Sequence, residues 1–491
     1  MTMKYLIYPT VQLFLYDLRE SFGDNPDKIA ANWDNFRRKL PEEWHQKLEP
    51  YNLDFEPEYV ELHQNRLEQF VADDSARYQG FYYPVRMSDM YGLLLDCSVN
   101  QQQELQRCEP SIKEIKAEID RRISDHQPTL GQTWLIYAQL PQFGSHLPAD
   151  IAKRCYKSLI PDANWDNDYQ GQGQIFGGTA FELWRFKSGV PDIPANHHQS
   201  PGTATPIFQN HHVMIILYPD ATAAKQGAEL FSEWMRLFGY RAKIMWAYEQ
   251  GRFLKKRLKS YASTIQDCLR TIYEENHQTL PLPTLQETLN LGIKISQKYN
   301  IDVDYLADQS RTIAINLDNY QKVIENIAQR LQVAELGTVP RAANVTFLAN
   351  FSDLVAKKYG RQVEKDYENL RPGLQRLELA IATIRSLVEV ERARQERRFQ
   401  NNITIFGWGL GAAALVSSLS AQFPYVIVPV EVLTTEPTTP PDRNSITTVE
   451  LQPSLSASWS GPLISLGYSL MAALLFSFIA WLWIKITDRT D

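Results

Sequence analysis

Basic residues are not in excess in this chain of 491 residues, which has 50 Lys and Arg, 57 Asp and Glu and a net charge of -7. A phosphate-binding surface needs clustered positive charge, so the sequence argues against nucleic acid as a partner. Cysteine is also scarce, and the four cysteines lie far apart with no CxxC pair. Neither a zinc knuckle nor a disulfide framework is indicated, and a reducing compartment is the simpler interpretation.

Catalytic motifs are missing as well: no HExxH, GxSxG or Walker sequence occurs. The stretch 162–173 resembles a calcium-binding loop, but Asn167 replaces the turn glycine and Gly173 replaces the bidentate Glu, so we interpret it as a polar loop. The glycines of 171–178 do not fit GxGxxG. We therefore predict no catalytic residue and no cofactor, and we assign no metal ligand. An enzyme remains an alternative, because distant segments can assemble a site.

Two weaker candidates have plain structural interpretations. The histidine pairs 197–198 and 211–212 cannot each chelate a metal from one side, because adjacent residues on a strand point to opposite faces. Asp302 and Asp304 come just before an expected helix, and we interpret them as capping residues.

Long uncharged runs occur near the C-terminal end, at 403–423 and 463–484. Each covers about 30 Å as a helix, which is the thickness of the bilayer hydrocarbon. We predict two transmembrane helices joined by a Pro-, Ser- and Thr-rich extracytoplasmic loop at 424–462. The lipid bilayer is then the expected partner, and the protein is a multi-pass protein of the cell membrane.

Positive charges beside these runs predict the orientation. Basic residues flank the outer ends of both runs, whereas the loop has only Arg443, so both chain termini should face the cytoplasm. Gly407 and Gly411 form a GxxxG pair, which predicts a close packing face toward the second span or toward another subunit. The orientation residues are Arg392, Arg394, Arg397, Arg398, Lys485 and Arg489.

Heptad spacing precedes the first run. Apolar residues recur at steps of four and three over 313–331 and again over 370–388, which predicts a helical bundle or a coiled-coil stalk. Pro372 and Gly373 should end one helix and begin another that continues into the membrane. The expected helices are 248–273, 284–299, 303–332, 343–370 and one from 373 onward.

The part before the stalk has a mixed pattern. Residues 133–250 show the order strand, helix, strand, strand, helix, strand, with RAKIMW (241–246) as the last strand, which predicts a ferredoxin-like α+β domain. Two short similarities, KYLIYPTVQ with TWLIYAQLP and YGLLLDCSV with VMIILYP, suggest that the first 130 residues repeat part of the order of 133–250 through a duplication.

This layout resembles the CorA family of divalent-cation channels, most closely over 398–419, where a long helix enters the first span. The resemblance implies a homo-oligomer whose first spans line an axis. The Gly-Met-Asn motif that closes the first span of that family does not occur here. No selectivity residue is therefore carried over.

The sequence predicts an α+β protein with a helical stalk and a C-terminal transmembrane hairpin. Our functional hypothesis is a non-enzymatic membrane protein whose cytosolic head senses or binds something and whose stalk is coupled to the membrane. The alternatives are a homo-oligomeric CorA-like channel, with Ser417, Ser418 and Ser420 facing the pore, and a membrane-anchored enzyme. The predicted divisions are 1–130 (α+β), 131–250 (ferredoxin-like), 251–402 (stalk), 403–423 (span), 424–462 (loop), 463–484 (span) and 485–491 (tail).

Overall fold

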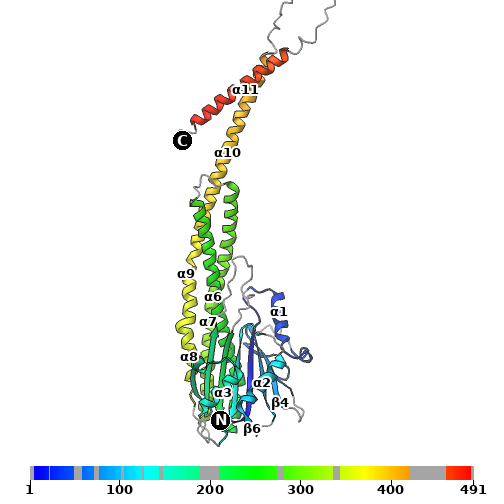
Figure 1. Ribbon diagram of the computed structural model, residues 1–491, viewed down its shortest axis with the longest axis vertical. Coiled ribbons are helices and arrows are strands. Elements are labelled where there is room, and N and C mark those ends of the chain that lie inside the picture. The colour runs from blue at the N-terminus through cyan, green and yellow to red at the C-terminus, as the bar shows by residue number, and fades with distance from the viewer. Residues whose placement is uncertain are drawn as a thin grey trace, which may run out of the picture. The chain divides into compact units, whose positions relative to one another are not determined.

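The computed structural model describes a mixed α+β chain with a large sheet and long helices (Figure 1). The chain forms two compact units, Met1–Thr271 with Leu291–Ala380, and Ile272–Asn290 with Ile381–Asp491. The described residues are 5–21, 23–48, 58–70, 77–100, 104–123, 127–142, 147–187, 209–274, 281–335, 343–420 and 460–487.

The first unit contains a ten-stranded sheet whose main order is β2-β4-β5-β1-β7-β10-β9-β8, with β3 beside β4 and β6 beside β1. The central strands are rich in β-branched and aromatic residues, which suit a buried pleated surface. The strands are β1 (Tyr5–Leu18), β2 (Tyr59–Glu61), β3 (Glu68–Phe70), β4 (Tyr78–Met87), β5 (Met90–Val99), β6 (Leu105–Arg107), β7 (Gly131–Gln139), β8 (Tyr169–Ile175), β9 (Gly178–Lys187) and β10 (Gln209–Tyr218).

The two halves of this sheet meet at β1 and β7, which pair antiparallel. The suspected duplicates are placed symmetrically, since β5 lies beside β1 and β10 lies beside β7. Their directions differ, however: β5 is antiparallel to β1, whereas β10 is parallel to β7. Between β1 and β5 the chain forms β2, β3 and β4, whereas between β7 and β10 it forms only β8 and β9 among the described residues. The two halves of the sheet therefore share the order of these strands but not their directions.

Helices contact both faces of the sheet. One face packs on α1 (Pro26–Arg37), α2 (Cys108–Ile123) and α3 (Pro148–Leu159), whose buried side chains include Phe36, Ile115 and Ile151. The other face packs on α5 (Ala221–Ala228) and on the long helices that follow it. A short helix, α4 (Trp165–Asp168), and a 3-10 turn, η1 (Glu42–Trp44), complete the sheet region.

The long helices are α6 (Phe231–Glu274), α7 (Leu282–Glu335), α8 (Thr346–Leu354), a π-helical segment η2 (Val355–Gly360), α9 (Arg361–Leu370), α10 (Pro372–Ser420) and α11 (Ser460–Thr487). The break at Pro372 is confirmed, because α9 ends at Leu370 and Pro372 begins α10, where its missing N–H costs nothing. The expected gap between 299 and 303 was wrong, since α7 is continuous there. Asp302 and Asp304 lie inside α7 and are not capping residues.

The ferredoxin-like prediction was wrong in one decisive element. RAKIMW lies inside α6 and is not a strand. Its alternating polar and apolar residues imitate a strand, but both cations are buried and paired: Arg241 with Glu182, and Lys243 with Asp89 at 2.8 Å. The chain leaves the sheet as helix after β10, and the side of β7 away from β10 is paired with β1 of the first half.

The second unit contains α10 from Ile381 onward, the apolar helix α11, the end of α6 and the start of α7. Within α11, Leu466–Trp483 is long and apolar enough to cross a membrane, with a mean hydropathy of 1.7. The described part of the first predicted span is helical to the end of α10, and its side chains Phe406, Trp408 and Leu410 are exposed. Residues 421–459, which include most of the predicted loop, lie outside the described residues.

Candidate functional site

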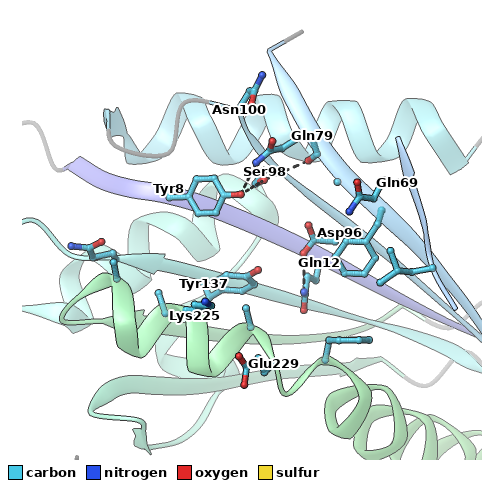
Figure 2. A pocket seen from close by; sticks show the side chains of 18 of the residues that line it. Tyr8, Gln12, Gln69, Gln79, Asp96, Ser98, Asn100, Tyr137, Lys225 and Glu229 are labelled. Atoms are coloured by element: carbon cyan, nitrogen blue, oxygen red, sulfur yellow. Dashed lines mark hydrogen bonds between the residues drawn. The ribbon is translucent and has the colours of Figure 1, made fainter. Parts of the chain in front are cut away.

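A pocket of about 1030 Å³ lies in the first unit, on the face of the sheet that packs on α5 and the long helices (Figure 2). Strands β1, β3, β4, β5 and β7 form its floor and wall, and α5 with the start of α6 forms the other side. Its lining combines amide, hydroxyl and carboxyl groups with aromatic rings. The polar lining residues are Tyr8, Gln12, Gln69, Gln79, Asp96, Ser98, Asn100, Tyr137, Gln139, Lys225 and Glu229.

The pleat of the sheet explains why polar groups gather here. Residues two apart on a strand share a face. On β5 the core residue Leu94 is followed on the same face by Asp96 and Ser98, and on β7 Leu135 is followed by Tyr137. One face of the sheet thus changes from apolar core to polar pocket lining over neighbouring strands.

A bulge in β1 brings Tyr8 into the pocket. The pairing of β1 with β7 shifts between Ile7 and Thr10, and Tyr8 has a φ of 49°, which is uncommon for a residue with a side chain. The Tyr8 hydroxyl accepts a hydrogen bond from Gln79 Nε2 at 2.7 Å and lies 3.2 Å from Ser98 Oγ (Figure 2). The bulge therefore ties β1 to β4 and β5 at the pocket wall.

Gly80 makes room for this wall. A Cβ atom at Gly80 would lie 1.9 Å from the Asp96 carbonyl oxygen and 2.4 Å from the Phe70 ring. No side chain can be accommodated at that distance, so glycine is required where β4 approaches β5 and β3.

Asp96 is the most unusual group in the pocket. Its side chain is buried, it lies opposite Gln12 in the β1–β5 register, and its Oδ2 accepts a hydrogen bond from Gln12 Nε2 at 2.8 Å. Burial raises the pKa of the Asp96 carboxyl to about 7, although hydrogen bonds from Gln12 and Tyr137 act in the opposite direction. The carboxyl is thus close to equally protonated and ionised at neutral pH.

The polar lining of the pocket is suited to binding a polar ligand. A carboxyl with a pKa near 7 can serve as a general acid or base. The described lining residues include no His or Cys, and the second carboxyl, Glu229, and the amine of Lys225 are on exposed residues of α5 and the turn after it. Many amide donors and acceptors around a large cavity are typical of a site that orients a polar ligand.

A cluster of polar side chains, Glu182, His212 and Arg241, is buried between the sheet and the helices of the same unit. Glu182 Oε1 is 3.1 Å from His212 Nε2 and 3.2 Å from Arg241 Nη1, and His212 Nδ1 is 3.0 Å from Thr133 Oγ1. The Arg241 guanidinium also lies over the Phe351 ring at 3.9 Å. Burial and the Arg241 charge lower the pKa of His212 to about 4, in spite of Glu182.

The burial of this cluster favours a structural role. Desolvation acts to raise the pKa of Glu182, but Arg241 and His212 outweigh it and the net effect is a lowered pKa. No pocket residue belongs to the cluster. It joins β9 and β10 to α6 and α8.

The other sequence candidates have structural partners. Asp168, from the calcium-like stretch, is buried and accepts hydrogen bonds from Tyr156 and Arg185. The stretch itself contains a short helix and a strand, so its interpretation as a polar loop was wrong. Asp302 pairs with Arg257. His212 is in the cluster above, and the pair 197–198 lies outside the described residues. No group of three His, Cys, Asp or Glu side chains suited to a metal ion occurs in the described part of the chain.

Two cysteines that look unrelated in sequence are neighbours in space. Cys108 Sγ on α2 and Cys155 Sγ on α3 are buried and 3.0 Å apart, and the hydrogen bond with Cys108, together with burial, raises the pKa of Cys155. Their spacing of 47 residues gave no signal.

The predicted membrane residues are only partly in contact. Among the described residues, nothing lies within 4 Å of a Cβ at Gly407 or Gly411, whereas a Cβ at Gly409 would meet Ser477 Oγ of α11 at 2.3 Å. Ser477 Oγ also donates to the Ile405 carbonyl at 3.4 Å. The packing role of Gly407 and Gly411 toward another subunit therefore stays a prediction.

The orientation residues lie on helices where they are described. Arg392, Arg394, Arg397 and Arg398 are exposed on α10, and Lys485 Nζ lies 4.6 Å from the Trp481 ring centre on α11. Arg489 lies outside the described residues. Their relation to a membrane stays a prediction.

The fold and the site define an α+β protein with a polar pocket and an apolar C-terminal helix. No protein-family model and no curated protein matches the chain. Among solved structures it is similar to one described as the full-length CmaX protein, with 13% identity over 72% of this chain and 89% of that chain. The TM-score of 0.21 is too low for this likeness to carry an argument about fold or function.

Proposed function

We propose that this chain is a non-enzymatic, two-pass membrane protein whose cytosolic head binds a small polar ligand in the Asp96 pocket. Helix α10 couples the head to the membrane. The pocket supports the binding role, because it is large, concave and lined by convergent polar groups. The exposed apolar side chains of α10 and α11 support the membrane role.

The continuity of α10 is the observation that carries the coupling. At its start, a Cβ on Gly373 would meet Tyr299 Oη at 2.2 Å, and Leu377 and Ala380 are buried. The helix then continues without interruption to Ser420. Movement at its first turns would be transmitted along one hydrogen-bonded rod.

Cysteine labelling of intact cells tests the topology. Ser445→Cys places a thiol in the proposed extracytoplasmic loop, and Lys113→Cys places one on an exposed position of α2. A membrane-impermeant maleimide should label the first variant in intact cells and the second only after the cells are opened. Labelling of Lys113→Cys in intact cells, or protection of Ser445→Cys, would contradict the proposal.

A homo-oligomeric channel is the second candidate, and one observation favours it. Small residues at the spacing of Gly407 and Gly411 allow two helices to approach closely, and no described atom of the single chain lies within 4 Å of a Cβ at either position. A second copy could occupy that face. The mass of the particle in detergent separates this candidate from a monomer.

A further inference from the structure

Among the described residues, every buried acidic side chain except one is paired with a basic side chain. Seven acidic side chains are buried, and six of the seven form an ion pair with Lys or Arg. Buried charges are costly unless they are paired, so these pairs are expected. The paired residues are Asp17, Asp168, Glu182, Glu249, Asp302 and Asp366.

Asp96 is the exception, and it is also the buried carboxyl that lines the pocket. Its partners among the described residues are the neutral groups of Gln12 and Tyr137. Lys225, which also lines the pocket, is exposed on α5 and does not form an ion pair with Asp96. Among the described residues, no Lys or Arg forms an ion pair with Asp96, which lines an open cavity.

Aromatic rings surround the same position. Phe81 stands directly opposite Asp96 in the β4–β5 register and meets Phe231 edge to face, with ring centres 5.9 Å apart. Tyr8, Phe70 and Tyr137 also line the cavity. Ring faces attract organic cations and also pack on their carbon atoms, so a carboxylate beside aromatic rings is a suitable receptor for an ammonium group.

We propose that the Asp96 pocket binds an organic cation, whose ammonium group pairs with the Asp96 carboxylate while its carbon skeleton contacts the aromatic rings. This inference deepens the proposed ligand-binding role of the head and rests on it. Phosphorylated ligands fit less well, because Lys225 is the one basic side chain among the described lining residues. The amide side chains would orient polar groups elsewhere on the ligand.

Calorimetric titration of the full-length protein in mild detergent at pH 8 tests the proposal. The probes are phenethylammonium, choline and spermidine, with 2-phenylethanol as the neutral counterpart of the first and magnesium chloride as a metal control. At least one ammonium probe should bind with one site per chain. 2-Phenylethanol should bind at least tenfold more weakly than phenethylammonium.

Three variants assign the binding to this pocket. Asp96→Asn keeps the shape of the side chain and removes its charge, and it should weaken the ammonium probe at least tenfold. Asp120→Asn removes the same charge from an exposed position on α2 and should change affinity less than twofold. Phe81→Leu should weaken binding severalfold by removing the ring. Circular dichroism and a thermal melt of each variant establish that it is folded.

The outcomes distinguish the inference from the proposed function. Equal binding of the alcohol and the amine, or full affinity in Asp96→Asn, would overturn the cation site and leave a ligand-binding head. Magnesium binding that Asp96→Asn abolishes, or no binding by any ammonium probe, would also overturn it. The cysteine labelling is independent of all these results and tests the membrane topology alone.

Discussion

Asp96 makes the stability of the protein depend on pH in an unusual direction. An unfolded Asp ionises near pH 3.8, whereas burial holds the folded carboxyl protonated until about pH 7. Its contribution is therefore fully present below pH 3.8 and is lost as the pH rises toward 7. The loss amounts to about 4 kcal/mol if the ligand site is empty.

Replacing Asp96 by Asn should remove this loss. We expect Asp96→Asn to be more stable than the wild type at pH 8 and nearly equal to it at pH 4, because Asn resembles the protonated acid. Denaturant unfolding at several pH values, followed by far-ultraviolet circular dichroism, measures the difference. A gap between the two proteins that stays constant from pH 4 to pH 8 would show that Asp96 does not titrate in this way.

The contribution of His212 to the stability of the protein depends on pH in the opposite direction. Its pKa of about 4 in the folded protein lies below the 6.5 of an unfolded His, so the unfolded state takes up a proton first as the pH falls. Stability from this residue is present above pH 6.5 and is lost toward pH 4, by about 3 kcal/mol. His212→Gln should remove that part of the acid sensitivity.

The matched control for His212 is His45→Gln. His45 is half-buried and contacts the Leu40 carbonyl outside the buried cluster. Unfolding free energies measured from pH 7.5 to 4.5 should show a shallower decline only in the His212 variant. The same slope in His212→Gln and the wild type would rule out this source of acid sensitivity.

Neither the pocket nor the buried cluster could be predicted residue by residue. The lining of the pocket extends from Ile7 to Phe231, and the Glu182, His212 and Arg241 cluster joins two strands to a helix. Such groups become neighbours only through strand order, which local sequence patterns do not contain. In the sequence His212 is only one of two adjacent histidines, and its acidic partner, Glu182, lies on the neighbouring strand β9.

Among the elements, α10 is the one on which the coupling proposal depends. Leu387→Pro removes a backbone donor and clashes with the preceding turn, at a cost of about 3 kcal/mol. We expect this break to leave probe binding in the pocket unchanged. Any change in hydrogen exchange that the bound probe causes in α10 beyond residue 387 should disappear.

Leu387→Ala serves as the control for this helix break, because alanine shortens the same side chain and favours helix. It should behave like the wild type in both measurements. Persistence of the probe-induced change beyond residue 387 in the proline variant would mean that α10 does not transmit it.

Element patterns were predictable where the signal was local. The apolar run of α11, the heptads and the break at Pro372 all depend on residues within a few turns of one another. The prediction of a strand at RAKIMW was wrong, because alternating charged and apolar residues also occur in a buried helix whose cations are paired. The ferredoxin-like topology failed with it.

At the scale of the whole molecule, the number of chains in the particle decides between the two proposed functions. A ligand-binding head on a two-pass anchor needs one copy, so light scattering of the detergent-purified protein should give a protein mass of 56.6 kDa. Detergent is subtracted by its refractive index. A mass that is a fixed multiple of this value would favour the channel and assign the open face at Gly407 and Gly411 to a neighbouring copy.

The position of β1 also has a consequence for biosynthesis. This strand is the first of the sheet in the chain and lies at its centre, between β5 and β7. As the polypeptide emerges from the ribosome, β1 has no neighbour until β5 is made, and the second half cannot dock until β7 follows. The nascent chain therefore exposes a long, aggregation-prone strand early. We expect ribosome-associated chaperones to bind this strand before translation reaches α5.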